Sequence, residues 1–196
     1  MVWTIFNHPP SGNNLLLIGM SPSAKLLVII SDQDETTIEF WLWTYGKDAP
    51  DGNNNNKSNH PQSNPFLIQL SDTYTNENNL GAPKSIEFHP NKEQHFMIVF
   101  EKSVLFFCWD FESNKVTKTI HPKTPSNLRV GHYSDATYVN HCHESFVASS
   151  KGSILVFGTT IYARNYADEA IDNEKFYVKC IKISRAYINC LTSIDQ

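Results

Sequence analysis

Short runs of apolar and β-branched residues recur along the chain, and polar turn residues close each run. Apolar residues spaced three and four apart, the pattern of an amphipathic helix, are scarce over long windows. Short apolar runs bounded by Gly, Pro, Asn, Asp or Ser are typical of β-strands. The pattern therefore predicts an all-β protein.

The predicted strands form three successive rounds of four. In each round a strand leads into a polar turn, a more hydrophobic strand follows, and a tight turn precedes the third strand. The predicted strands are 15–19, 26–31, 37–43 and 66–70, then 85–88, 95–100, 103–109 and 116–120, then 136–139, 145–149, 153–157 and 177–183. A fourth round is predicted to begin with a strand over 187–192. Repeated four-stranded units predict the blades of a β-propeller.

The third strand of each round ends near an aromatic residue, which is Trp41, Trp109 or Phe157. Trp109 is followed by Asp110, and a Trp-Asp pair at this place is a signature of WD-type blades. We interpret Trp41, Trp109, Asp110 and Phe157 as structural residues that cap the blades. The chain is thus predicted to be a partial WD40-type propeller of about three four-stranded blades plus edge strands of neighbouring blades.

The interval between Trp41 and Trp109 is longer than one blade, which spans about 40 to 45 residues. The Asn-rich stretch 47–64 lies in this interval and has almost no core-forming residues. Burial therefore cannot offset the entropy of ordering it. We interpret 47–64 as a loop insertion, and the polar stretch 71–84 as a second connection of this kind.

The whole chain, 1–196, is predicted to be a single partial propeller. A closed propeller has about four to eight blades, and open sheet edges favour aggregation. We therefore expect the chain to belong to a longer polypeptide, or its propeller to be completed by additional chain. The expected divisions are blade one in 1–46 and 65–70 with a preceding blade's outer strand at 2–6, blade two at 83–120, blade three at 130–183, and the start of a fourth blade at 186–196.

The composition excludes several classes of function. The net charge is −4 and no block of basic residues is present, so nucleic-acid binding is not expected. No run of about 18 apolar residues and no signal peptide are seen, so we expect no membrane association and a cytoplasmic location. Four cysteines without CxxC spacing are expected to be reduced thiols, namely Cys108, Cys142, Cys180 and Cys190.

Two residue clusters could suggest chemistry. His141, Cys142 and His143 precede a carboxylate, but a tetrahedral metal site needs further ligands that no spacing supplies. We interpret this stretch as a solvated turn and expect no metal site. No Gly-rich phosphate loop occurs, so no cofactor is expected.

His132, Asp135 and Ser149 contain the residue types of a hydrolase triad. No nucleophile-elbow motif surrounds any serine, so we do not expect an enzyme. The charged segment 163–175 is either a solvated connection between strands or a partner contact on the propeller rim.

Five stretches carry a resemblance to a known family. They are "WTIF" at 3–6, "IEFWLWT" at 38–44, the stretch 86–110 with "VLFFCWD", "VGHYSDATY" at 130–138, and "ASSKGSILVFG" at 148–158 followed by 179–195. Together they resemble the WD-repeat proteins of motile cilia, in the family that supplies a subunit of the calmodulin- and spoke-associated complex at the base of radial spoke 3. The first and third rounds depart from it because they lack the Trp-Asp pair.

The resemblance implies a non-enzymatic scaffold of the ciliary axoneme that helps to anchor radial spokes to doublet microtubules and supports ciliary motility. It implies axonemal partners: radial spoke subunits, the doublet microtubule and a calmodulin-containing complex. The residues alone support an interaction scaffold, because rigid blades hold loops that contact other proteins. A cytosolic WD-repeat adaptor in another assembly is the alternative, and a hydrolase with a concave polar pocket is a third class.

Overall fold

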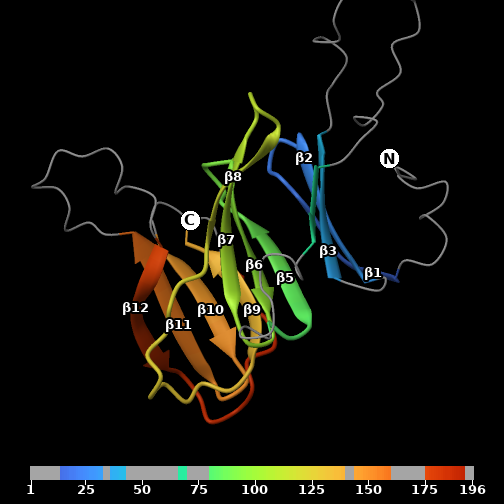
Figure 1. Ribbon diagram of the computed structural model, residues 1–196. Helices are drawn as coiled ribbons and strands as arrows, with labels where there is room; N and C mark the ends of the chain where they lie inside the picture. Colours follow the sequence, from blue (N-terminus) through green and yellow to red (C-terminus); the bar gives the residue numbers. More distant parts are fainter. Residues whose placement is uncertain are drawn as a thin grey trace, which may run out of the picture. The chain divides into compact units, whose positions relative to one another are not determined.

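The computed structural model describes residues 14–32, 36–42, 66–69, 80–139, 144–159 and 175–192 (Figure 1). These residues form three four-stranded antiparallel sheets, and none of them is helical. The all-β fold with four-stranded units is therefore confirmed. Several predicted features lie outside the described residues: the outer strand at 2–6, the loop at 47–64, most of the connection at 71–84, His141, Cys142 and His143, and nearly all of 163–175.

Each sheet is built from four strands that are consecutive in the chain. The first sheet contains β1 (Asn14–Met20), β2 (Leu26–Asp32), β3 (Thr36–Leu42) and β4 (Phe66–Gln69). The second contains β5 (Pro83–Phe88), β6 (His95–Phe100), β7 (Val104–Asp110) and β8 (Lys115–Ile120). The third contains β9 (Tyr133–Tyr138), β10 (Ser145–Ser149), β11 (Ser153–Thr159) and β12 (Lys175–Lys182). Each of the twelve strands predicted for the three rounds overlaps one of these.

The chain divides into two compact units, and the first unit holds the sheet β1–β4. Burial alternates along β3, where Ile38, Phe40 and Leu42 are buried and the residues between them are half-buried. The apolar residues of β2 are buried on both faces, which explains its unbroken apolar run. The ring of Phe40 contacts that of Phe66 on β4, with centroids 5.9 Å apart.

The second unit holds the sheets β5–β8 and β9–β12, which share one hydrophobic core. The ring of Phe106 lies 5.9 Å from that of Phe157 in this core. Each large apolar side chain buried there contributes roughly 1.5–3 kcal/mol to folding. The core residues are Met97, Val99, Val104 and Phe106 from β6 and β7, with Val130, Tyr133, Ala136, Tyr138, Val147, Leu155 and Phe157 from the third sheet and the segment before it.

The segment 187–192 is not a strand, so this prediction was wrong. Side chains of β9 form hydrogen bonds with the backbone of this segment, in place of the backbone hydrogen bonds of a strand pair. The hydroxyl of Ser134 donates to the carbonyl of Ile188 at 2.6 Å, and the amide of Leu191 donates to the carboxylate of Asp135 at 2.8 Å. Residues 187–192 are mostly apolar, as in a strand. A strand also needs backbone hydrogen bonds to a neighbouring strand, and none of the described residues supplies such a neighbour. The blade limits within the chain stay predictions.

Candidate interaction surface

The two sheets of the second unit have the same corner. We use "corner" for the turn between the second and third strands together with the segment before the first strand, at 80–82 with 101–102 and at 130–132 with 150–152. In the second sheet the amides of Glu101 and Lys102 donate to the carbonyls of Ala82 and Leu80, both at 2.8 Å. In the third sheet the amide of Ser150 donates to the carbonyl of His132 at 2.7 Å.

A glycine with positive φ lies at the centre of each corner. Gly81 has φ +74° and Gly131 has φ +78°, a region that favours glycine. A Cβ on Gly81 would be 2.7 Å from Cβ of Glu101, and one on Gly131 would meet Oγ of Ser150. Both glycines therefore let the segment before the first strand lie close to the turn between the second and third strands. The strand pattern does not reveal these glycines, although an aliphatic residue followed by Gly before each first strand is a signal for them in the sequence.

The corners also join consecutive segments of the chain. The amide of Tyr133 at the start of β9 donates to the carbonyl of Glu101 at 2.8 Å. After β12, the amides of Ile183 and Ser184 both donate to the carbonyl of Gly152 at 3.0 Å. The turn of one sheet thus binds the backbone of the segment that follows the sheet, which fixes the spacing of the repeat.

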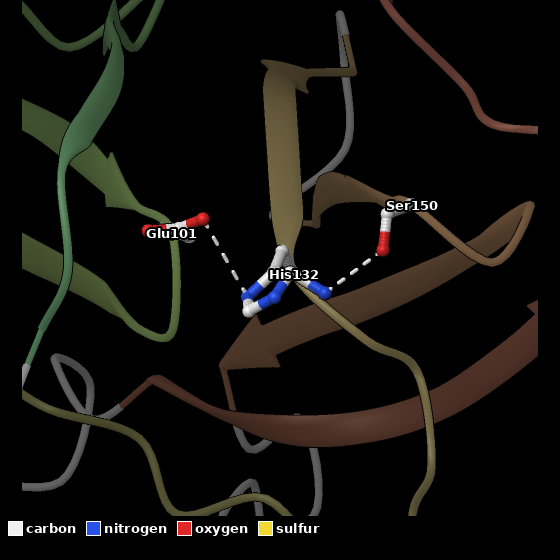
Figure 2. Close-up of polar contacts among 3 residues, drawn as sticks. All are labelled: Glu101, His132 and Ser150. Carbon is white, nitrogen blue, oxygen red and sulfur yellow. Dashed lines mark hydrogen bonds and ion pairs between the residues drawn. The ribbon is translucent and has the colours of Figure 1, made fainter.

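His132 brings polar groups of both sheets together at this surface (Figure 2). Its amide donates to Oγ of Ser150 at 2.9 Å, and its Nδ1 lies 3.8 Å from a carboxylate oxygen of Glu101. The side chains of His132 and Glu101 are 58% and 33% exposed, so water competes with this contact. An exposed polar cluster on rigid turns is accessible to other molecules.

The residues of the hypothetical triad are not joined into a catalytic arrangement. Ser149 is buried and its hydroxyl accepts a hydrogen bond from the amide of Ser153 at 3.1 Å. Asp135 accepts from the amide of Leu191, and His132 faces Glu101. Each group thus has a structural partner of its own.

The first strands of the two sheets carry a pair of acids. Glu87 on β5 is half-buried, and burial, followed by the negative charge of Asp135 on β9, raises its pKa to about 7. Burial and the charge of Glu87 also raise the pKa of the Tyr138 hydroxyl. A hydrogen bond to Asp135 is the main cause that raises the pKa of the exposed Cys190 thiol. The charge on these strands therefore changes near neutral pH.

The predicted blade-capping residues have different surroundings. Trp109 is 2% exposed and Phe157 is fully buried, whereas Trp41 is half-buried and donates from Nε1 to a carboxylate oxygen of Glu39 at 2.9 Å. Asp110 accepts from the amides of Glu112 and Ser113 at 3.0 and 3.3 Å, and from the hydroxyl of Ser113 at 2.5 Å. These bonds hold its pKa below the usual value and shape the β7–β8 turn.

Strand register places Trp41 and Phe157 at equivalent positions and Trp109 at a different one. The first and second strands of the three sheets end and begin with the pairs Met20–Leu27, Phe88–Phe96 and Tyr138–Ser145. On the third strands Leu27, Phe96 and Ser145 pair with Trp41, Phe107 and Phe157, which are therefore the equivalent rings. Trp109 lies two residues further along its strand than Phe107. At the position of Trp109 the third sheet has Thr159, and the shorter turn of the second sheet concealed this shift from sequence spacing.

Within the described residues, no group of three or more His, Cys, Asp or Glu side chains is arranged to hold a metal ion. Cys108, Cys180 and Cys190 are free thiols. A helix with the length and apolarity needed to cross a bilayer is likewise not found in the part of the chain that the structure describes.

Two curated relatives are similar in sequence, although no family model matches the chain. Cilia- and flagella-associated protein 251 of Mus musculus is 22% identical over 200 residues, which cover 100% of this chain and 14% of the relative. The protein of the same name from Pongo abelii is 20% identical over 158 residues, which cover 80% of this chain and 12% of the relative. The chain thus spans a small part of each relative. The resemblance to a ciliary WD-repeat family is confirmed.

Solved structures show the same fold. The WD40 repeats of RRP9 match with a TM-score of 0.50 at 10% identity, covering 92% of this chain and 44% of that chain. A luciferin-regenerating enzyme matches with a TM-score of 0.53, also at 10% identity, covering 92% of this chain and 50% of that one. At this identity the likeness shows the fold alone. The chain has the fold of a partial WD40-type β-propeller.

Proposed function

We propose that this chain is a non-enzymatic WD-repeat scaffold of the ciliary axoneme. The observation that carries the proposal is the similarity over the full chain to cilia- and flagella-associated protein 251, together with the WD40-type fold. The scaffold would help to anchor radial spokes to doublet microtubules and so support ciliary motility. Its location would be the axoneme, within the cytoskeleton of the cytoplasm.

The arrangement of polar groups supports binding over catalysis. The corners hold backbone and side-chain groups on turns that the sheets fix in place. His132, Asp135 and Ser149 bond to other residues and so form no nucleophile, base and orienting group. We propose radial spoke subunits, the doublet microtubule and a calmodulin-containing complex as partners.

The proposal is tested by fractionation of ciliated cells that express the epitope-tagged protein. Axonemes are isolated, extracted with detergent and then with salt, and the protein is followed by immunoblot. We expect it to remain with the doublets after detergent. Recovery in the soluble fraction of the cell body would overturn the ciliary scaffold and favour the cytosolic WD-repeat adaptor.

A further inference from the structure

Positive charge is concentrated in two segments of the chain. Residues 113–134 and 175–194 contain no Asp or Glu, although the whole chain has 20 acids and a net charge of −4. The cations in them are Lys115, Lys118, Lys123, Arg129, Lys175, Lys179, Lys182 and Arg185, which is half of the 16 Lys and Arg residues. The remaining chain is strongly acidic, so the bulk charge conceals two basic segments.

The fold brings these segments together on one side of the second unit. Ile120 at the end of β8, Leu128 in the following segment and Cys180 on β12 all pack against the same hydrophobic core. Arg129 follows Leu128, and Lys179 precedes Cys180. In Figure 1 the yellow segment after β8 runs along the sheet that contains β12. We call the surface of Lys118, Lys123, Arg129, Lys179, Lys182 and Arg185 the basic edge.

The cations of the basic edge face solvent. Apart from Lys118, which is half-buried, they are exposed. The ion pair found among the described residues joins His132 to Glu101, and it involves none of these cations. The Nζ of Lys182 donates to the carbonyl of Lys151, which keeps its charge at the surface. No ion pair with an acid is thus found for these cations in the part of the chain that the structure describes, and their clustered charge favours anionic groups.

The backbone of β12 adds a second property. β12 is the last strand of its sheet, so among the described residues one of its edges lacks a neighbouring strand. Three exposed apolar residues, Val178, Ile181 and Ile183, lie next to Lys179 and Lys182 in the sequence. Extended peptides add to such an edge through main-chain hydrogen bonds, and side chains supply the specificity.

We propose that the basic edge binds an acidic, extended polypeptide segment of a partner protein. The positive charges of the basic edge attract acidic side chains, and the unpaired edge of β12 can form main-chain hydrogen bonds with an extended peptide. A nucleic acid fits less well, because the chain as a whole is acidic, with a net charge of −4. The inference rests on the proposed scaffold function and gives one of its partners a chemical class.

The test measures binding of a fluorescein-labelled decaglutamate peptide to the purified 196-residue chain by fluorescence anisotropy. The variant Arg129→Glu with Lys179→Glu reverses two exposed charges of the basic edge. The matched control, Lys84→Glu with Lys92→Glu, makes the same charge change at exposed positions on β5 and in the β5–β6 turn. Circular dichroism and urea unfolding confirm that both variants fold.

We expect saturable binding at low salt that weakens as salt increases. The basic-edge variant should bind about tenfold more weakly or worse, and the control should remain within about twofold of the wild type. Equal weakening by both variants, or no saturable binding, would overturn the proposal. Displacement of the peptide by a DNA duplex at lower concentration than unlabelled peptide would also overturn it and identify a polyphosphate site.

The peptide-binding test and the fractionation test can fail independently of each other. A protein that leaves the axoneme but binds the peptide through the basic edge refutes the ciliary location alone. A protein that stays on doublets but shows no charge-specific binding refutes the basic edge alone.

Discussion

The sheets β5–β8 and β9–β12 have the same strand order and the same corner, but their side chains differ at three equivalent positions. The first strands end at equivalent pairs, Phe88–Phe96 in the second sheet and Tyr138–Ser145 in the third. Counting back from Phe88 and Tyr138, Glu87 corresponds to Thr137 and Ala82 to His132. The register of the third strands makes Trp109 correspond to Thr159. Backbone geometry is therefore what the two sheets share, and side-chain chemistry is what distinguishes them.

The shared elements explain why the sheets pack in succession. Each corner needs a glycine with positive φ and a turn whose carbonyl accepts an amide from the next segment. None of these interactions depends on a particular polar side chain. The same backbone therefore carries different side-chain chemistry from one sheet to the next.

The largest effect is expected from Trp109→Thr, which gives the second sheet the residue of the third. Trp109 is 2% exposed, and its loss leaves a cavity that should cost about 3–5 kcal/mol of unfolding free energy. The control is Trp41→Thr, which removes a half-buried ring and should cost about half as much or less. Urea unfolding measures both. Equal losses would restore the equivalence of the two tryptophans that their register contradicts.

Substitution of the corner glycine tests the backbone geometry that the two sheets share. Gly131→Ala should cost about 1–3 kcal/mol, because alanine disfavours φ +78° and its Cβ meets Oγ of Ser150. Adding Ser150→Gly should recover the part due to the contact and leave the part due to φ. Urea unfolding of Gly131→Ala, of Ser150→Gly and of the double variant separates the two terms, because Ser150→Gly alone measures the loss of the acceptor for the His132 amide. A silent Gly131→Ala would show that the corner does not constrain the sheet.

Glu87 gives the second sheet a pH dependence that Thr137 cannot give the third. Its pKa is about 7 when folded and near 4.5 otherwise, so the folded chain binds more protons between these values. The unfolding free energy should therefore fall as pH rises from 4.5 to above 7. Because Glu87 is half-buried, solvent screening reduces this contribution to about 1–2 kcal/mol.

Glu87→Gln should remove that dependence, measured as the difference in urea unfolding free energy between pH 5 and pH 8. The exposed Glu112→Gln is the matched control, since it removes the same charge from the β7–β8 turn. An unchanged pH difference in Glu87→Gln would show that Glu87 is not the source of the dependence.

The sequence predicted the strands well because their apolar runs are short and closed by turn residues. It aligned Trp109 wrongly with Trp41 and Phe157 because the turn after β6 contains two residues, Glu101 and Lys102, whereas the turn after β10 contains Ser150, Lys151 and Gly152. Strand spacing alone does not reveal such a change. The corner and the basic edge were missed because each unites residues that only folding brings together.

The smallest effect is expected from His132→Ala, which gives the third corner the residue of the second. The side chain of His132 is 58% exposed and its Nδ1 lies 3.8 Å from Glu101, so its loss should change the unfolding free energy by less than about 0.5 kcal/mol. The amide that donates to Ser150 is retained in the variant. Urea unfolding at neutral pH measures the change. A loss above about 1 kcal/mol would mean that the histidine ring itself holds the two sheets together, and the corner would then depend on side chain as well as backbone.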